Sequence, residues 1–488
     1  MNNTDLIAAL PLILLAATGL LVMMWDAFEK SPSHIPLYLT ILGAMAATGA
    51  AIMNLGHNAV AFDGLFFDNS FSNFFTIIFS VATILTALLA EKYLQAEEVI
   101  IGEFSALTLF AACGMVMMAS GGSLIVTFLG LETMSICFYI MAGMFRTKQE
   151  SNESALKYFL LGSFATGFFL YGIALVYGSF GTLSIIKIHD IILHDPLKAK
   201  LALESPLMIF GAVLIIIGLS FKVAAFPFHQ WAPDVYEGAP TVVAGYMSTA
   251  GKAAAFSAFV LIFGYAILPK ASLGYGVKIQ TMIAVLAACS MLYGNIVAIS
   301  QRKIKRMLAY SSTAHAGYIL LGVAAMNSQG VTGIAIYTAV YTLMQIGAFG
   351  IVALLEKETG GGTDLDDYAG LAKREPTKAL LLSVLMLPLA GIPPFAGFFG
   401  KYYLFAAALQ AGLTWLVIVG VVSSIIGSYF YLRIIVLMYF RDSKHDISEA
   451  ISEKTNVSLI AVGLASFGLL VLGLLPDTLL GIAQQFFH

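Results

Sequence analysis

Apolar segments long enough to cross a lipid bilayer recur along nearly all of the 488 residues. A membrane-spanning helix needs about 20 predominantly apolar residues. Segments of that kind lie at 4–24, 34–53, 72–91, 104–120, 122–143, 154–178, 206–236, 240–268, 279–300, 305–326, 331–355, 378–410, 413–440 and 457–481. The sequence therefore predicts an all-α polytopic membrane protein with about 14 transmembrane helices.

The composition supports this fold class. Only 11% of the residues are charged and 59% are hydrophobic, whereas soluble proteins carry about 25% charged residues. This excludes an ordinary soluble enzyme, and a net charge of -3 offers no basic surface for nucleic acid. Cys113, Cys137 and Cys289 lie in apolar runs and form no C-x-x-C pair, so we expect no bound metal and no disulfide framework.

The distribution of basic residues predicts the orientation in the membrane. With the N-terminus outside, the inside loops hold fifteen Lys and Arg residues and the outside loops hold five. Loops on the cytoplasmic side of membrane proteins are enriched in Lys and Arg. We therefore expect both termini on the outer face and an even number of helices, with the lipid bilayer as the surrounding medium. The connector His57–Asn69 is expected to lie at the membrane interface.

A few charged residues remain inside the predicted spans. Five of the 25 basic residues are not in loops, namely Lys157, Lys222, Lys252, Lys401 and Arg433. Glu132 is the one carboxylate near the middle of a span. Charges at this depth cost several kcal/mol and generally mark a functional site. We expect Glu132 to pair with a buried lysine, and Lys252, among small residues, to exchange its proton as a reversible carrier.

Two of the predicted spans are interrupted by proline. Lys222 lies five residues before Pro227, and Pro388, Pro393 and Pro394 precede Lys401 in the twelfth span. Proline removes a helical hydrogen bond, and the freed carbonyls are tolerated in a membrane only next to protein or a watery cavity. Interrupted segments at corresponding places in two halves are typical of the internal repeats of transporters.

Several other residues have both a functional and a structural interpretation. His229 and His315 are candidates for a proton relay because an imidazole group ordinarily titrates near neutrality. As structural alternatives, His229 suits the capping of exposed carbonyls and His315 suits a hydrogen-bonded core position. Lys157 follows Glu153 by four residues, which suits a local ion pair as well as a relay. Lys401 follows a wide break where it either caps carbonyls or extends to the interface, as Arg433 near the inner end is expected to do.

Nucleotide-binding motifs are missing from the sequence. It contains no G-x-x-x-x-G-K-[ST] loop and no G-x-G-x-x-G motif after a strand. We therefore expect the chain by itself to bind neither ATP nor NADH, and to hold no cofactor of its own.

Four linked motifs resemble one family over essentially the whole chain. They are SNESALKYFLLGSF, FPFHQWAPDVYEGAPT, IKRMLAYSSTAHAGY and GIPPFAGFFGKYYLF. Together they resemble the antiporter-like membrane subunits of respiratory complex I, a family shared with Mrp-type cation/proton antiporters. The resemblance implies two inverted five-helix repeats with broken seventh and twelfth helices. It divides the chain into an N-terminal segment (1–103), two repeats (104–268 and 279–440) and a C-terminal helix (441–488).

The resemblance also implies functional residues. Glu132 and Lys222 match the family's coupling pair, Lys252 its central proton lysine, and Lys401 its terminal lysine. His315 and Lys157 match positions of its polar axis, and His229 follows its helix break. Implied partners are the membrane-arm subunits M, K, J, A and H in a bacterial inner membrane. FMN, iron–sulfur clusters and quinone would be bound by other subunits.

The implied function is proton translocation coupled to quinone reduction. Charge changes elsewhere in the complex would open or close the Glu132–Lys222 pair and so alter the proton affinity of Lys252. Three alternatives stay open. They are an Mrp-like secondary antiporter, the equivalent subunit of a ferredoxin-driven photosynthetic complex, and a structural membrane scaffold with vestigial charges.

Overall fold

The computed structural model describes residues 3–29, 33–95, 101–267, 276–359, 361–442, 456–475 and 481. Its separate long helices are α1 (Asn3–Phe28), α2 (Ile35–Met53), α3 (Ser70–Gln95), α4 (Ile101–Ser120), α5 (Leu124–Ala142), α6 (Gln149–Phe180), α9 (Pro206–Lys222), α13 (Gly276–Ile299), α14 (Ile304–Ala325), α15 (Ser328–Thr359), α17 (Pro376–Ala390), α18 (Ala396–Gln410), α19 (Thr414–Phe440) and α20 (Asn456–Leu474).

One more long helix is continuous over Thr241–Ile267. It consists of α11 (Thr241–Tyr246), the π-helical η2 (Met247–Gly251), α12 (Lys252–Phe259) and the π-helical η3 (Val260–Ile267). The short elements are β1 (Asn58–Ala61), η1 (Phe62–Gly64), β2 (Phe66–Asn69), α7 (Ile185–His194), α8 (Pro196–Leu203), α10 (Trp231–Gly238), η4 (Leu365–Tyr368) and α16 (Leu371–Arg374).

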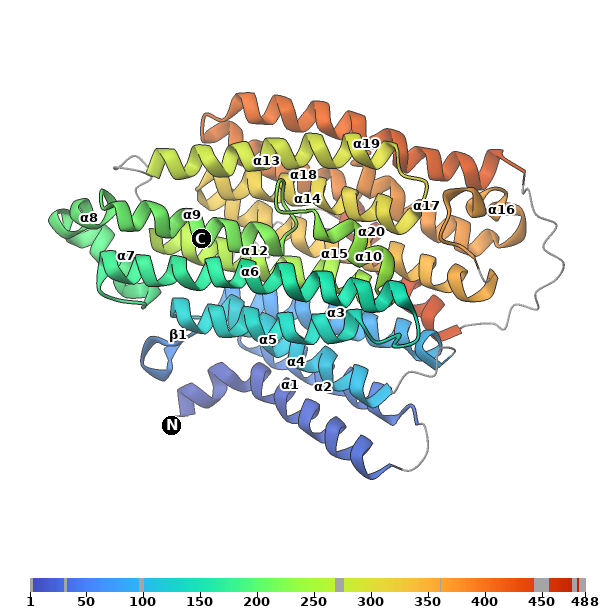
Figure 1. The fold of residues 1–488 in the computed structure, drawn as a ribbon, viewed down its shortest axis with the longest axis horizontal. Coiled ribbons are helices and arrows are strands. Elements are labelled where there is room, and N and C mark those ends of the chain that lie inside the picture. The colour runs from blue at the N-terminus through green and yellow to red at the C-terminus, as the bar shows by residue number, and fades with distance from the viewer. Residues whose placement is uncertain are drawn as a thin grey trace.

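The long helices lie side by side in stacked rows, with α1 and α2 at one edge of the molecule and α19 at the opposite edge (Figure 1). Among the helices that are long and apolar enough to cross a membrane, Thr241–Ile267 and Ser328–Glu356 are the most enclosed. In each, 89% of the residues of the apolar window are buried, against 33% for α1. The central position of these two helices matters because one of them carries Lys252.

Eleven helices of the described residues are long and apolar enough to cross a membrane, or twelve if the bent pair α8 and α9 forms one span. The predicted count of about 14 is therefore not confirmed by this criterion. The three predicted spans outside the eleven are 206–236, 305–326 and 378–410. The first and third are divided into shorter helices, and the second, α14, carries the polar run Ser311, Ser312 and Thr313.

Both proline-containing segments are broken helices in the structure. α9 ends at Lys222, and α10 begins at Trp231 beyond Pro227. α17 contains Pro388 and ends at Ala390, and α18 begins at Ala396 beyond Pro393 and Pro394. Each break places a lysine beside it, because Lys222 ends α9 and Lys401 lies in the second turn of α18.

Glycine allows several helices to approach each other closely. A Cβ atom built on Gly114 of α4 would lie 2.6 Å from the carbonyl oxygen of Gly130 in α5. A Cβ on Gly172 of α6 would lie 2.8 Å from the carbonyl oxygen of Gly211 in α9. Small residues at such contacts are the usual means of packing helices in lipid, where the hydrophobic effect does not drive association.

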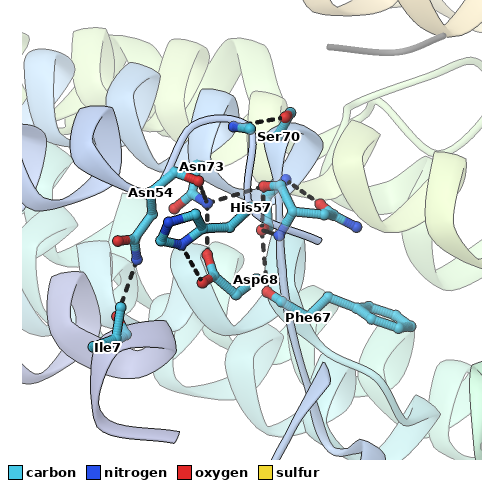
Figure 2. Close-up of polar contacts among 10 residues, drawn as sticks. Ile7, Asn54, His57, Phe67, Asp68, Ser70 and Asn73 are labelled. Carbon is cyan, nitrogen blue, oxygen red and sulfur yellow. Dashed lines mark hydrogen bonds and ion pairs between the residues drawn. The ribbon is translucent and has the colours of Figure 1, made fainter. Parts of the chain in front are cut away.

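The connector expected at the interface is a β-hairpin. β1 pairs with β2 in antiparallel register from Asn58↔Asn69 to Ala61↔Phe66. Figure 2 shows the polar cluster that anchors it. The Asp68 carboxylate, 2% exposed, lies 3.3 Å from His57 Nδ1 and accepts a 2.7 Å hydrogen bond from Asn73 Nδ2. Asp68 thus links the hairpin to the start of α3.

We predict that Asp68→Asn destabilises the protein. The amide keeps one acceptor oxygen in place of two, so it cannot serve both Asn73 Nδ2 and His57 Nδ1 with oxygens as the carboxylate does. We expect a loss of about 1–3 kcal/mol, the scale of leaving a buried group without its partner. The matched control is Asp63→Asn, which removes the same charge from an exposed position of the hairpin at φ 54°, where Asn is tolerated. Thermal unfolding of the detergent-purified protein should show a lower Tm for the first variant alone. Equal Tm values for both variants would contradict the anchoring role of Asp68.

Candidate functional site

Four buried titratable side chains form the core of the site, and we call Lys222, Lys252, His315 and Lys401 the polar axis. Their exposed fractions are 5%, 2%, 1% and 5%, respectively. All four come from the interrupted or π-helical helices and from α14. Burial of this kind leaves an ionised group dependent on its protein neighbours for stabilisation.

Lys222 is held at the first break by hydroxyl groups and aromatic rings. Its Nζ donates hydrogen bonds to Ser135 Oγ at 2.8 Å and to Tyr158 OH at 3.0 Å. The ammonium also lies 5.0 Å from the centre of the Tyr158 ring, in the range of a cation–π interaction. Tyr158 in turn stacks on Trp231, the first residue of α10. The site of Lys222 is therefore built from both sides of the break.

The expected ion pair between Glu132 and Lys222 is not formed. Within the described residues, no ion pair with an N···O distance of 4 Å or less joins the two side chains, although the charge of Glu132 still acts on Lys222 over a longer distance. Glu132 Oε1 is buried and has no hydrogen-bond partner among the described residues. Lys222 is satisfied instead by Ser135, which lies one helical turn after Glu132 on α5. A carboxylate left unpaired in this way is free to accept a new cationic partner.

Lys252 begins α12 directly after the π-helical segment η2. Its Nζ donates one hydrogen bond, of 3.0 Å, to the Ser312 carbonyl oxygen of α14. An ammonium group has three donors, and no other hydrogen bond or ion pair of Lys252 occurs within the described residues. A single carbonyl stabilises a buried ammonium poorly, so the charged form of Lys252 has little support from its described neighbours.

His315 lies between three tyrosines. Its Nδ1 is 2.6 Å from Tyr337 OH, and its Nε2 is 2.9 Å from Tyr431 OH. Tyr431 OH also hydrogen-bonds Ser311 Oγ, and the His315 ring packs 5.0 Å from the ring of Tyr341. His315 lies within electrostatic range of both Lys252 and Lys401. It therefore occupies the middle of the axis, with a hydroxyl on each ring nitrogen.

Lys401 lies at the second break. Its Nζ donates to Ser424 Oγ at 2.9 Å and lies 3.4 Å from the Leu389 carbonyl oxygen at the end of α17. It also lies 4.7 Å from the centre of the Tyr318 ring. Lys401 thus makes the predicted contact with carbonyls freed by the helix break. Its contact with Tyr318 also connects it to α14, the helix that carries His315.

His229 and Lys157 lie beside the axis. The buried Nδ1 of His229 has no hydrogen-bond partner among the described residues, and its ring packs 4.6 Å from Tyr293. His229 is also within electrostatic range of Lys252. Lys157 is 40% exposed and forms ion pairs with Glu153 at 2.6 Å and Asp234 at 2.8 Å. Lys157 therefore makes the local pair that its spacing suggested and a second pair with α10.

The second pair of Lys157 belongs to an ion-pair cluster that the sequence reasoning missed. Arg306 donates to Asp234 at 2.7 Å and to Glu237 at 2.8 Å, and Lys303 lies 2.5 Å from Glu237. Asp234 and Glu237 are the two carboxylates of the WAPDVYEG motif on α10. The cluster therefore joins the short helix after the first break to α14 and, through Lys157, to α6.

We predict that Glu237→Gln weakens this attachment by about 1 kcal/mol, the scale of partly exposed ion pairs. Burial raises the pKa of Glu237, but hydrogen bonds from Lys303 and Arg306 outweigh it, so the pKa lies below its ordinary value. The bond to Glu237 raises the pKa of Lys303.

The signs of these shifts define a pH window for the effect. A carboxylate with a lowered pKa stabilises the fold above its unfolded pKa and loses this contribution as the pH falls. An ammonium with a raised pKa loses its contribution as the pH rises. The decrease in Tm caused by Glu237→Gln should therefore be constant between about pH 5 and pH 10. A decrease confined to one end of this range would show that the ion pairs do not carry it.

The tyrosines around His315 were also missed. Tyr337 and Tyr341 lie four residues apart on the apolar helix α15, and Tyr431 lies on α19, 116 residues from His315. The spacing of the first two was a usable signal, because residues i and i+4 share a helix face. No local pattern pointed to Tyr431. Within the described residues, no group of three or more His, Cys, Asp and Glu side chains is arranged to hold a metal ion.

Comparison with known proteins places this arrangement in a family. The family model described as NADH:quinone oxidoreductase/Mrp antiporter, TM, matches residues 121–427, which include the whole polar axis. NADH-quinone oxidoreductase subunit N 1 of Chloroherpeton thalassium is 40% identical over 99% of this chain and 98% of its own length.

Two solved structures share the fold. A chain of respiratory complex I from Thermus thermophilus with bound aureothin has a TM-score of 0.78 and 31% identity, covering 96% of this chain and 97% of that one. A chain of the Mrp complex from Dietzia sp. has a TM-score of 0.81 and 21% identity, covering 98% and 96%, and shows the fold alone. The protein belongs to the family of antiporter-like membrane subunits shared by NADH:quinone oxidoreductase and Mrp antiporters.

Proposed function

We propose that this chain is the N-type membrane subunit of an NADH:quinone oxidoreductase and that it moves protons across the membrane. Its multi-pass helical fold and its similarity to subunit N of Chloroherpeton thalassium support this assignment. The observation that carries it is the polar axis itself. Three buried lysines and a histidine lie in apolar helices, and each is held by hydroxyl, carbonyl or aromatic groups instead of a carboxylate.

Proton exchange is the chemistry that this arrangement suits. A lysine paired closely with a carboxylate stays charged, whereas one held only by neutral dipoles gives up and regains its proton easily. His315 lies within electrostatic range of both Lys252 and Lys401. Each of its ring nitrogens contacts a tyrosine hydroxyl, which can donate or accept a proton, so His315 is suited to connect the two lysines. In our proposal a proton resides on Lys252, passes by way of His315 and its tyrosines to Lys401, and leaves beside Ser424. The axis thereby returns to its starting charge after each transfer.

Glu132 provides the coupling in this proposal. Its unpaired carboxylate approaches Lys222 in one state, which keeps Lys222 protonated and offsets its positive charge. When Glu132 is drawn away, Lys222 gives up its proton or repels the proton on Lys252. In the other state Glu132 turns away, as in the structure, where Lys222 hydrogen-bonds Ser135 and Tyr158. Quinone reduction elsewhere in the complex drives the exchange between the states. Lys157, in the ion-pair cluster, and His229, at the first break, modify the electrostatic environment of Lys222 and Lys252 in this proposal.

The remaining assignments follow from the same proposal. NADH oxidation and quinone reduction take place in other subunits, which bind FMN, iron–sulfur clusters and quinone. The chain works beside membrane-arm subunits M, K, J, A and H in a bacterial inner membrane, with both termini on the periplasmic side. Residues 104–268 and 279–440 form two inverted repeats, each with one of the two broken helices, between the segments 1–103 and 441–488.

The test uses the complete complex isolated in mild detergent and reconstituted into vesicles. Our proposal predicts that NADH and quinone drive proton translocation, detected with a pH-sensitive dye, and that the chain copurifies with other membrane-arm subunits. An isolated chain that exchanges protons for Na⁺ down an imposed sodium gradient, without NADH, would establish a secondary antiporter instead.

A further inference from the structure

A polar cavity lies at the membrane face that the basic loops mark as the inner one. It has a volume of about 210 Å³ and is lined by residues that include Lys148, Glu237, Lys305, Glu356 and Thr363. Its walls come from α3, the segment before α6, the end of α10, α14 and the end of α15. A polar space of this size accommodates several water molecules. We call it the vestibule.

The floor of the vestibule is tied to the helix that carries Lys252. Glu356 Oε2 accepts hydrogen bonds from Thr241 Oγ1 at 2.5 Å and from Tyr93 OH at 3.2 Å. Thr241 is the first residue of the continuous helix that includes Lys252. Beside it, the buried Lys305 donates to the Ala239 carbonyl oxygen at 3.0 Å. The acidic Glu356 and the basic Lys305 thus lie together at the floor of the vestibule.

Two polar rows lead from this floor to the polar axis. On α14 the row comprises Lys305, Leu308 (through its carbonyl), Ser312 and His315. On α15 it comprises Gln345, Tyr341 and Tyr337, and Glu356 lies on the same face about three turns nearer the floor, beyond the apolar Phe349 and Val352. These spacings place each row on one helix face. Gln345 Nε2 donates to the Leu308 carbonyl oxygen at 3.3 Å, and Tyr341 OH donates to Ser312 Oγ at 2.8 Å. The two rows therefore face each other along a seam.

Two buried polar atoms on this seam have no partner. Tyr236 OH and Gln345 Oε1 make no hydrogen bond with any of the described residues, and both residues are 0% exposed. The Tyr236 ring packs between Trp231 at 5.8 Å and Phe349 at 6.2 Å. The Ser312 side chain lies close enough to interact with the Tyr236 hydroxyl as a hydrogen-bonding group, although no hydrogen bond of good geometry is formed, and Tyr341 lies nearby. Buried polar groups nearly always have a partner. Two that lack one, between the vestibule and Lys252, mark the position of a transferable proton or a bridging water.

We propose that protons enter the chain through the vestibule and reach Lys252 along this seam, with Tyr236 and Gln345 as the connecting groups. The inference rests on the proposed function, because it supplies the proton that Lys252 carries. A hydronium ion in the vestibule gives a proton to the Tyr236 hydroxyl as that hydroxyl releases its own proton inward. A water held by Gln345 and Ser312 passes this proton to the neutral Lys252 amine. One hydronium becomes water, one ammonium forms, and each hydroxyl is restored.

The test compares single variants in the complete complex. Tyr236→Phe removes only the hydroxyl, and Gln345→Leu keeps the side-chain size. The matched control is Tyr246→Phe on α11, whose hydroxyl bonds Thr83 and Thr108 on the opposite side. We expect NADH-driven proton translocation to fall about 100-fold in the first two variants, the lower end of the loss for a missing proton-transfer group. We also expect a larger solvent isotope effect in D₂O, which a merely structural role would not produce.

The reference variant Lys252→Met distinguishes a failure of the entry route from a failure of the proposed function. If it abolishes translocation while Tyr236→Phe and Gln345→Leu translocate normally, the entry route is wrong and the proposed function stands. If Lys252→Met translocates normally, the proposed function fails, and the entry route fails with it.

A second measurement does not depend on the folding of these variants. Thr363→Cys places a thiol in the vestibule wall, and Ser300→Cys places one on the same membrane face outside it. After reaction with a bulky membrane-impermeant maleimide, proton translocation should stop in the first variant and continue in the second and in the parent chain. Continued translocation by fully labelled Thr363→Cys would overturn the entry route.

Discussion

Lys252→Met is expected to abolish coupled proton translocation while the complex still assembles. Methionine fills the space of the lysine stem without a titratable group, and the lost hydrogen bond to the Ser312 carbonyl is the one such contact of Lys252 in the described residues. Since the relay loses its central carrier, translocation should fall by at least the factor of about 100 associated with a missing acid–base group. The measurement is the dye response of reconstituted vesicles per NADH oxidised.

The control for this prediction is Ser257→Ala on the same helix. Ser257 is buried, but among the described residues its hydroxyl bonds only the Ala254 carbonyl oxygen of its own helix. It should therefore assemble and translocate protons normally. A Lys252→Met complex with normal translocation would remove the basis of the proposed function, whereas equal losses in both variants would indicate general damage to α12.

Gly397→Ala is expected to have the largest effect on assembly. Gly397 lies at the start of α18, and a Cβ atom there would lie 2.0 Å from the Pro388 carbonyl oxygen. A clash between a Cβ atom and a backbone oxygen cannot be relieved by a rotamer change, because neither atom moves with a side-chain torsion. The break between α17 and α18 would therefore have to open. Overpacking costs about 1–3 kcal/mol and occasionally more, and here it also displaces Lys401, one turn further along.

Gly167→Ala is the matched control for this steric prediction. Gly167 lies within α6, and its added Cβ would meet nothing within 4 Å. Alanine is the better helix former, so this variant should keep or slightly raise the Tm. Gly397→Ala should instead lower the Tm by several degrees and reduce the yield of the assembled complex. An unchanged Tm for Gly397→Ala would show that the break tolerates expansion.

The sequence was informative where the signal is local. Apolar runs predicted most of the helices, and Pro227 and Pro393 predicted where two of them are interrupted, because proline acts on its own helix. The scarcity of charge drew attention to Lys222, Lys252 and Lys401, all of which are buried in the structure. These features depend on single residues and their immediate neighbours, so no knowledge of the tertiary structure was needed to find them.

The contacts of those residues were beyond the reach of the sequence. Lys222 was expected to bind Glu132, but it bonds Ser135 and Tyr158, and Tyr158 is 64 residues away. The partner of His315 on α19 is likewise distant in sequence. The π-helical turn before Lys252 and the hairpin β1–β2 also depend on packing between helices. These features are decided by which helix faces pack against each other. One apolar sequence pattern is compatible with many such helix pairings, so the sequence alone does not select one.

In the proposed function Lys252 gains and loses a proton during each turnover. Its positive charge alone is not sufficient for proton translocation. Lys252→Arg tests this most directly, because a guanidinium keeps the charge but is not deprotonated in proteins. The decisive quantity is the number of protons translocated per NADH oxidised by the reconstituted complex. We expect Lys252→Arg to lose translocation as fully as Lys252→Met. Normal translocation by the arginine variant would contradict the proposed function.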